Sequence, residues 1–293
     1  MTRRFRLGYH VTGTAGPVAA AADPARARVA STIVPLVPPD NRTYRRVAAV
    51  VRPVLLAITR RDWRGQENLP AVDGFIAAGN HMTNIDPLTF AHFLYDNGRA
   101  PKILAKASLF AVPVLGGLLR RTGMIPVQRN TAAAASSLSA AVDALRSGEC
   151  VAVFPEGTLT RDPDLWPMVG KTGVARLALT TRVPVIPIAQ WGAHRILGRY
   201  KKLLKPIPPK KVTVVAGPPV DLSDLYDRPQ DSATLREATD RVMDAITALL
   251  EGIRAEKAPA VRFDMRTAPK PGPDRGADDT ATPSGDGTPD GAA

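Results

Sequence analysis

The sequence predicts an α/β fold: a single mixed, largely parallel sheet flanked by helices. Two patterns in the 293-residue chain support this. Short apolar runs, each long enough for one buried strand, alternate with stretches whose apolar residues recur at helical spacing. Polar residues directly follow several of the apolar runs, where loops leave the ends of the predicted strands. Sites in open α/β sheets form at such ends, so the fold class also predicts where functional side chains gather.

The expected elements follow one another from residue 44. Apolar residues at helical spacing predict a helix over 44–58, and the run GFIAAG at 74–79 predicts the first strand. A second helix at 86–95 precedes short strands at 102–105 and 124–127. A helix at 132–147 ends before Gly148, in the position that favours a left-handed residue. The remaining elements are a strand at 150–154, a helix at 171–181, strands at 183–189 and 212–216, and a last helix over 235–253 that Ser232 is expected to cap.

The two ends of the chain differ in composition from its middle. Residues 1–40 combine prolines and small residues with five arginines, and residues 266–293 are rich in Pro, Gly, Asp and Thr. Neither end has enough periodic apolar residues to form a core. We therefore expect a disordered basic arm at 1–40, one folded domain at 41–265, and a disordered tail at 266–293.

The charge balance points to a polyanionic partner. The chain has 39 Lys and Arg against 27 Asp and Glu, a net charge of +12. Such a surface suits nucleic acid, phosphorylated metabolites or an anionic membrane. Nucleic acid is disfavoured, because the sequence carries no zinc-finger, RNA-recognition or homeodomain signature. The single cysteine, Cys150, excludes an internal disulfide and a multi-cysteine metal site, and we expect no metal and no cofactor.

A candidate catalytic pair follows the 74–79 strand. His81 and Asp86 lie five positions apart across a strand-to-helix turn, which can bring the carboxylate back onto the imidazole. A carboxylate that orients an imidazole makes it a general base, and no Ser or Cys nucleophile accompanies the pair. This favours deprotonation of a substrate hydroxyl that attacks an activated acyl group. The alternative is that Asp86 only caps the helix before Pro87 and that His81 is a polar turn residue.

Arg129 ends the 124–127 strand region, just before a predicted helix. A guanidinium beside a helix N-terminus suits a phosphate, because bidentate hydrogen bonds and the helix dipole both favour an anion there. The alternative is an ordinary solvated arginine.

A polar turn follows the strand at 150–154. It contains Glu156, Gly157 and Thr158, and Arg161 comes three residues later. Glycine lets the backbone approach a ligand closely, while threonine hydroxyls and a guanidinium can bind one. The alternative is a simple turn with Glu156 in a salt bridge.

Four blocks in this order resemble those of the glycerophospholipid acyltransferase superfamily, and are most similar to the bacterial 1-acyl-sn-glycerol-3-phosphate acyltransferases. The resemblance extends over roughly residues 45–250. The blocks are His81-x4-Asp86, Gly123-x-Ile125-x3-Arg129, Phe154-Pro155-Glu156-Gly157-Thr158 and Val185-Ile186-Pro187-Ile188.

The resemblance implies a role for each block. It implies that His81 is the general base and that Asp86 orients it. It implies that the second and third blocks bind the phosphorylated acyl acceptor and that the fourth shapes the acyl-donor site. The acceptor-binding residues implied are Lys106, Arg129, Glu156, Gly157, Thr158 and Arg161. The third block departs from the family pattern, which often has an arginine directly after Glu-Gly-Thr, where this chain has Leu159.

Two segments are expected to associate with a membrane. Residues 107–119 carry no charge and are bracketed by Lys106 and by Arg120 and Arg121. The segment is too short to span a bilayer but suits insertion at the interface, and the 44–58 helix is similar. The alternative is that both segments belong to a soluble core.

The sequence thus predicts an O-acyltransferase that moves a fatty acyl group from acyl-CoA or acyl carrier protein to lysophosphatidic acid, giving phosphatidic acid in phospholipid biosynthesis. The expected location is the cytoplasmic face of the cell membrane, as a peripheral or monotopic protein on an anionic surface. Two alternatives stay open: another acceptor, such as glycerol 3-phosphate, another lysophospholipid or a glycolipid, and a non-catalytic membrane lipid-binding protein.

Overall fold

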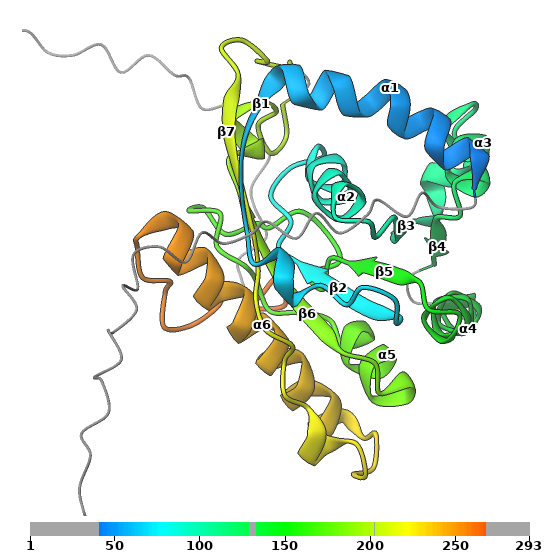
Figure 1. Ribbon diagram of the computed structural model, residues 1–293. Helices are drawn as coiled ribbons and strands as arrows, with labels where there is room; N and C mark the ends of the chain where they lie inside the picture. Colours follow the sequence, from blue (N-terminus) through cyan, green and yellow to red (C-terminus); the bar gives the residue numbers. More distant parts are fainter. Residues whose placement is uncertain (1–40, 129–132, 202, 268–293) are drawn as a thin grey trace, which may run out of the picture. The chain divides into compact units, whose positions relative to one another are not determined.

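Seven strands form one sheet at the centre of the fold (Figure 1). The structure is a computed structural model and describes residues 41–128, 133–201 and 203–267. The strand order is β1-β7-β6-β2-β5-β3-β4. Every neighbouring pair is parallel except β6 and β7, which are antiparallel. The predicted mixed, largely parallel sheet is therefore confirmed. The ends for which disorder is predicted lie outside the described residues, apart from 266–267.

The strands occupy the expected apolar runs, with one addition. They are β1 (Thr59–Arg64), β2 (Phe75–Gly79), β3 (Pro101–Lys106), β4 (Ile125–Val127), β5 (Cys150–Val153), β6 (Val185–Trp191) and β7 (Lys210–Ala216). The sequence did not predict β1. Its residues, TRRDWR, lack an apolar run, and the strand forms at the sheet edge because it pairs in register with β7.

Five helices follow the predicted order, and α3, within the segment expected only to associate with a membrane, is an addition. They are α1 (Arg42–Ile58), α2 (Asp86–Asp96), α3 (Leu115–Arg121), α4 (Ala133–Arg146), α5 (Gly173–Thr181) and α6 (Ser232–Arg254), with short 3₁₀ turns at η2 (Gln66–Asn68), η3 (Ala107–Ala111), η4 (Ala193–Arg195) and η5 (Ser223–Leu225). The expectation that Ser232 caps the last helix is wrong. The cap is Asp231, whose carboxylate accepts a 2.8 Å hydrogen bond from the Thr234 N–H.

Alternation along the central strands divides the core into two layers. In β2, Phe75 and Ala77 face α2, whereas Ile76 and Ala78 face α4, α5 and α6. Figure 1 shows these two groups of helices on opposite faces of the sheet. Helices therefore cover both faces of the central strands, as a largely parallel sheet requires.

The candidate functional residues follow strand ends that lie along one edge of the sheet, the edge formed by the carboxyl ends of its parallel strands. The strands β2, β3, β5 and β6 all end there. Because β7 runs antiparallel to β6, with Trp191 opposite Thr213, β7 begins at this same edge, and so does β1. The loops around His81, Lys106 and Glu156 and the loop that enters β7 consequently share one side of the domain. In the described part of the chain, no helix is long and apolar enough to cross a membrane.

Candidate active site

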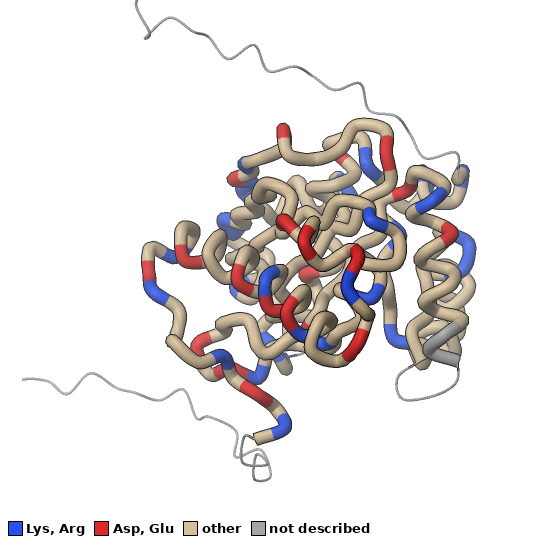
Figure 2. Tube along the Cα trace, turned by 90° about the horizontal axis from the view of Figure 1, so that it is seen from below, with Lys and Arg blue, Asp and Glu red and all other residues tan. Residues whose placement is uncertain are grey.

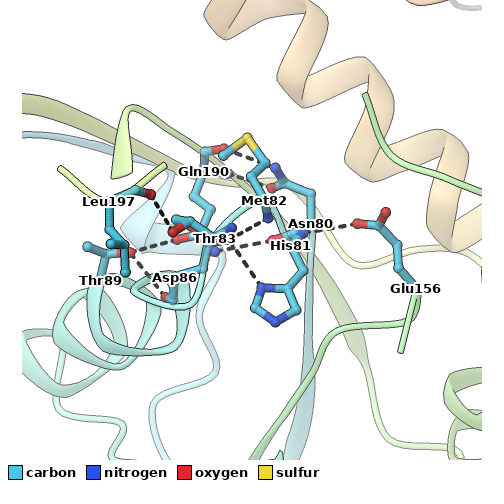
Figure 3. A network of polar contacts seen from close by, with 9 residues as sticks. All are labelled: Asn80, His81, Met82, Thr83, Asp86, Thr89, Glu156, Gln190 and Leu197. Atoms are coloured by element: carbon cyan, nitrogen blue, oxygen red, sulfur yellow. Dashed lines mark hydrogen bonds and ion pairs between the residues drawn. The ribbon is translucent and has the colours of Figure 1, made fainter. Parts of the chain in front are cut away.

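His81 and Asp86 meet at the end of β2 (Figure 3). The strand stops at Gly79, the chain turns, and α2 begins at Asp86. The His81 ring nitrogen Nδ1 lies 3.1 Å from Asp86 Oδ2. The same carboxylate oxygen accepts hydrogen bonds from the backbone N–H groups of Met82, at 2.5 Å, and Thr83, at 2.7 Å. The five-residue spacing therefore does bring the carboxylate back onto the imidazole.

This geometry rejects the simple helix-cap alternative for Asp86. The N-cap position of α2 is Ile85, and no side chain caps the helix there. The Asp86 carboxylate instead points back toward the turn before the helix and is completely buried. A buried carboxylate hydrogen-bonded to an imidazole and to two N–H groups is held in one orientation.

The His81 ring is held from a second side by the third block. It stacks on Phe154 with a ring-centroid distance of 4.3 Å and an interplanar angle of 22°. The side chain keeps 16% of its surface exposed, whereas Asp86 keeps none. With Nδ1 directed at the carboxylate, the opposite ring nitrogen, Nε2, is the one available to a ligand.

Glu156 joins the first block to the loop after β5. Its Oε1 accepts a 2.9 Å hydrogen bond from the His81 N–H, and its Oε2 accepts a 3.0 Å hydrogen bond from the Met168 N–H. The side chain is buried, and burial raises the pKa of Glu156 to about 8, although both N–H groups act in the opposite direction. Among the described residues it makes no ion pair with Lys or Arg, so a salt bridge does not account for it.

Two buried amides hold the end of β2 against β6. The Asn80 side chain donates to the Gln190 carbonyl at 3.0 Å and accepts from the Gln190 N–H at 2.8 Å. The Gln190 side-chain carbonyl accepts from the Thr89 hydroxyl at 2.8 Å, which ties in α2. Sequence reasoning missed this support. The available signal was one uncharged polar residue, Gln190, within the apolar run of β6.

A cavity of about 490 Å³ opens beside the third block, with Phe154, Pro155 and Gly157 in its wall. Lys106, at the end of β3, lines the cavity. Lys171 and Arg176, which sequence reasoning did not select, also line it. The other lining residues are mainly apolar: Leu104, Val127, Leu138, Val153, Val174 and Leu177.

Gly157 brings the Lys171 side chain close to the backbone of this cavity. The glycine has a φ of +68°, and a Cβ atom there would lie 3.0 Å from Lys171 Cδ and 3.3 Å from its Nζ. A side chain at position 157 would crowd Lys171, so the observed position of this lysine depends on a glycine at 157.

The remaining predicted site residues are placed differently. Thr158 is half-buried and Arg161 is exposed, and neither lines the cavity. Leu159, at the position where the family often has arginine, is buried. Arg129 lies outside the described residues, so its predicted contact with the acceptor stays a prediction.

Comparison with known proteins shows which family the chain resembles. Residues 60–191 match the Acyltransferase family model. Over 140 residues, 47% of this chain, it is 31% identical to the 1-acyl-sn-glycerol-3-phosphate acyltransferase BAT2, chloroplastic, of Brassica napus. Over 131 residues, 44% of the chain, it is 33% identical to the 1-acyl-sn-glycerol-3-phosphate acyltransferase of Borreliella burgdorferi. These matches span 39% and 50% of the two relatives' own lengths.

A further relative matches over a longer part of its own length, and a solved structure shares the fold. The 1-acyl-sn-glycerol-3-phosphate acyltransferase of Bacillus subtilis is 29% identical over 56% of this chain and 75% of its own length. The fold resembles the crystal structure of the 1-acyl-sn-glycerophosphate (LPA) acyltransferase PlsC from Thermotoga maritima, with a TM-score of 0.57 and 21% identity over 74% of this chain and 81% of that one. The resemblance to the acyltransferases seen in the four blocks is thus confirmed by the family model that matches residues 60–191 and by the named relatives.

Proposed function

We propose that this chain transfers a fatty acyl group from an acyl thioester to the free hydroxyl of lysophosphatidic acid, giving phosphatidic acid. The observation that carries the proposal is the His81–Asp86 pair, with its 3.1 Å contact and its partly exposed ring, within the segment that matches the Acyltransferase family model. The activity for which the relatives from Brassica napus, Borreliella burgdorferi and Bacillus subtilis are named supports the choice of acceptor.

His81 performs the proton transfers in this proposal. The Nδ1–H donates to Asp86, which leaves the lone pair on Nε2 to accept the acceptor's hydroxyl proton. The oxygen attacks the thioester carbonyl, the ester C–O bond forms, and the C–S bond breaks. The departing thiolate takes the proton back from Nε2, so His81 ends the cycle neutral. Asp86 stabilises the imidazolium between the two steps.

The cavity beside the third block supplies the acceptor's phosphate site in this proposal. Lys106 and Lys171 both line this cavity and supply two cations, and the absence of a side chain at Gly157 leaves room for Lys171. Arg129, Thr158 and Arg161 complete the acceptor set that the family resemblance implies. Glu156 holds the backbone of this site in place and does not bind the phosphate itself, because both of its oxygens accept hydrogen bonds from backbone N–H groups.

The acyl donor in this proposal is acyl-CoA or an acylated acyl carrier protein, and no metal or cofactor takes part. The protein works at the cytoplasmic face of the cell membrane, on an anionic surface. Exposed apolar side chains on the predicted membrane segments support that location: Val50 and Val54 on α1, and Leu109, Val112, Val114, Leu115 and Leu118 on or beside η3 and α3. These apolar side chains stay in contact with water unless a bilayer or another protein covers them.

A different acceptor is the second candidate function, and Leu159 is the observation that favours it. Where relatives of this kind often present an arginine to the acceptor, this chain has a buried leucine. Without that arginine the site carries less positive charge, which suits a smaller or differently charged head group.

The experiment that tests the proposal measures acyl transfer by wild type and by His81→Ala. Labelled acyl-CoA and acylated carrier protein are offered with lysophosphatidic acid, glycerol 3-phosphate and other lysophospholipids, and both thiol release and labelled product are followed. We expect product from lysophosphatidic acid, and we expect a fall of at least about 10²-fold in His81→Ala, the lower end for a lost general base.

A matched histidine variant separates catalysis from folding. His92 lies on α2 but contacts Trp63 and Asp96 rather than the site, so His92→Gln should retain its turnover per folded molecule. Full turnover by a well-folded His81→Ala protein would overturn the proposed base. Transfer to another acceptor alone would retain the mechanism and establish the second candidate function.

A further inference from the structure

The loop that enters β7 exposes a row of apolar side chains. This rim loop, residues 196–209, begins at Ile196, which is buried in the core and whose carbonyl accepts a hydrogen bond from the Lys205 N–H. Four large apolar side chains of the loop, named its apolar tip below, are exposed by 54–84%: Tyr200, Leu203, Leu204 and Ile207. The structure describes this loop except for residue 202.

The chain around the rim loop carries charge of one sign only. Residues 192–211 contain seven Lys and Arg and no Asp or Glu. On the face of the domain that Figure 2 presents, by contrast, acidic and basic positions are interspersed. The nearest carboxylate across the sheet edge belongs to Asp62, which pairs with Lys211 at 3.0 Å and with Arg64. The rim loop therefore combines exposed apolar side chains with an excess of cations.

The rim loop is bonded directly to the candidate active site. The Leu197 carbonyl accepts a 2.5 Å hydrogen bond from the Thr83 hydroxyl, in the turn that holds His81. The Arg199 guanidinium donates to the carbonyls of Thr160 and Asp162, at 2.9 and 2.6 Å, in the loop after the third block. The loop thus contacts both segments that carry the proposed site.

The rim loop also lies at the same sheet edge as the proposed membrane segments. Lys210, at the end of the loop, pairs with Thr59, the residue that follows α1. Figure 1 shows the loop beyond β7 at the same end of the domain as α1. A surface that touches a bilayer through the end of α1 would present the rim loop to that bilayer as well.

We propose that the rim loop is a second docking element for an anionic phospholipid bilayer, distinct from α1 and the η3–α3 segment. Leucine, isoleucine and tyrosine side chains at its tip enter the interface, and the flanking cations lie at the head-group phosphates. A nucleic acid would pair with the cations but leave three aliphatic side chains in water, whereas an anionic bilayer accommodates both kinds of side chain. The sheet edge that the loop shares with the end of α1 favours a bilayer over an acidic protein. The inference rests on the proposed function in one respect: that function places the protein on an anionic membrane.

Vesicle sedimentation without any substrate tests the proposal. The variant Leu203→Ser/Leu204→Ser/Ile207→Ser removes the apolar tip and keeps every cation. We expect its partition onto vesicles of phosphatidylcholine and phosphatidylglycerol to fall at least about tenfold, the change that burying a single side chain of this size produces. The matched control is Val72→Ser/Val261→Ser, which alters equally exposed apolar side chains elsewhere, and it should partition like wild type.

Separate outcomes overturn the docking proposal and the proposed function. Unchanged partition of the triple variant, or an equal loss in the control, would overturn the docking proposal. So would lost binding to acyl carrier protein with vesicle binding intact, because the occupant would then be a protein. Lost partition together with normal His81-dependent transfer to detergent-dispersed lysophosphatidic acid would support the docking proposal. If no acceptor is acylated under any condition, the partition result still decides the role of the loop.

Discussion

Asp86 Oδ2 accepts three hydrogen bonds, from His81 Nδ1 and from two backbone N–H groups, while its Oδ1 is buried without a hydrogen-bond partner among the described residues. An asparagine can keep all three contacts by placing its oxygen at the Oδ2 position. Its amide NH₂ then lies buried without an acceptor, and the negative charge beside the imidazole is lost. We expect Asp86→Asn to fold with reduced stability and to lose about 10²–10⁴-fold in kcat, the range for proton transfer by a positioned base.

The measurement is kcat per folded molecule, with the folded fraction taken from urea unfolding. Asp96→Asn is the matched control, because this carboxylate lies on the same helix and pairs with Arg52 and Arg61 away from the site. A kcat loss in both variants would show that the effect comes from α2 and not from the orientation of His81.

Glu156 makes folding stability depend on pH in an unusual direction. Burial raises its pKa from 4.5 to about 8, so the folded protein holds a proton there that the unfolded chain has released. Stability from this group is therefore complete below about pH 4.5 and is lost as the pH rises toward 8. Glu156→Gln removes this titration. A glutamine amide has one oxygen and one NH₂ group, so one of the two backbone N–H groups, of His81 or Met168, loses its acceptor and faces the NH₂ group.

We expect Glu156→Gln to be less stable than wild type at low pH and to approach it as the pH rises through this window. Urea unfolding of both proteins at about pH 5 and about pH 8.5 measures the difference, on either side of most of the titration. Glu67→Gln, at an exposed carboxylate, is the control and should follow wild type at both values. Parallel pH profiles for wild type and Glu156→Gln would show that Glu156 does not titrate in this range.

Part of the site was predictable from single residues and part was not. The spacing of His81 and Asp86 predicted their contact, because a short turn between a strand and a helix limits where the carboxylate can go. Lys171 was not predicted to join Lys106, since the two lie 65 positions apart and only the arrangement of β3 and α5 brings them to one cavity. Burial of Leu159 likewise depends on tertiary packing that no local pattern encodes.

At the scale of elements, the turn after β5 and the start of α5 form one proposed phosphate site. Lys171 lies two residues before α5 and rests against Gly157. A charge-assisted hydrogen bond to a phosphate contributes a factor of about 10–100 in binding, so Lys171→Met should raise the KM for lysophosphatidic acid by about that factor. Steady-state kinetics with varied acceptor measures it, with the thioester held at saturation.

Lys257→Met is the control for this variant, because the Lys257 side chain is 90% exposed and pairs with Glu251 near the end of α6, away from the cavity. A fall in kcat with the acceptor KM unchanged would contradict a binding role for Lys171 and would assign it to the reaction step.

The elements show why prediction from sequence succeeded for the interior of the sheet and failed at its edge. β2, β5 and β6 lie between helices on both faces, so their residues form continuous apolar runs that mark them clearly. β1 lies at the edge, four of its six residues are charged to suit solvent, and only its register with β7 makes it a strand. The same logic explains Asp231, since several polar residues precede α6 and local backbone geometry selects which one caps it.

At the scale of the whole domain, α1 and the rim loop are joined through the pairing of β1 with β7. Val50 and Val54 are exposed on α1 by 70% and 55%, and the leucines and isoleucine of the rim loop are exposed beyond the start of β7. If both surfaces contact one bilayer at the same time, their contributions to the binding free energy add, and the losses from removing them multiply. If the domain docks through one surface or the other, removing either surface leaves most of the affinity.

We therefore expect the five-site variant, with Val50→Ser and Val54→Ser added to the three rim-loop changes, to lose the product of the two separate partition factors. Vesicle sedimentation at low ionic strength measures all three variants beside wild type. Raising the salt to about 1 M shortens the screening length to about 3 Å and should weaken every variant by a similar factor, since each keeps the same cations. A five-site variant that loses far more than this product, with both parents close to wild type, would show that the surfaces dock as alternatives, because each would then substitute for the other. A five-site variant that binds no worse than its weaker parent would show that only that parent's surface contacts the bilayer.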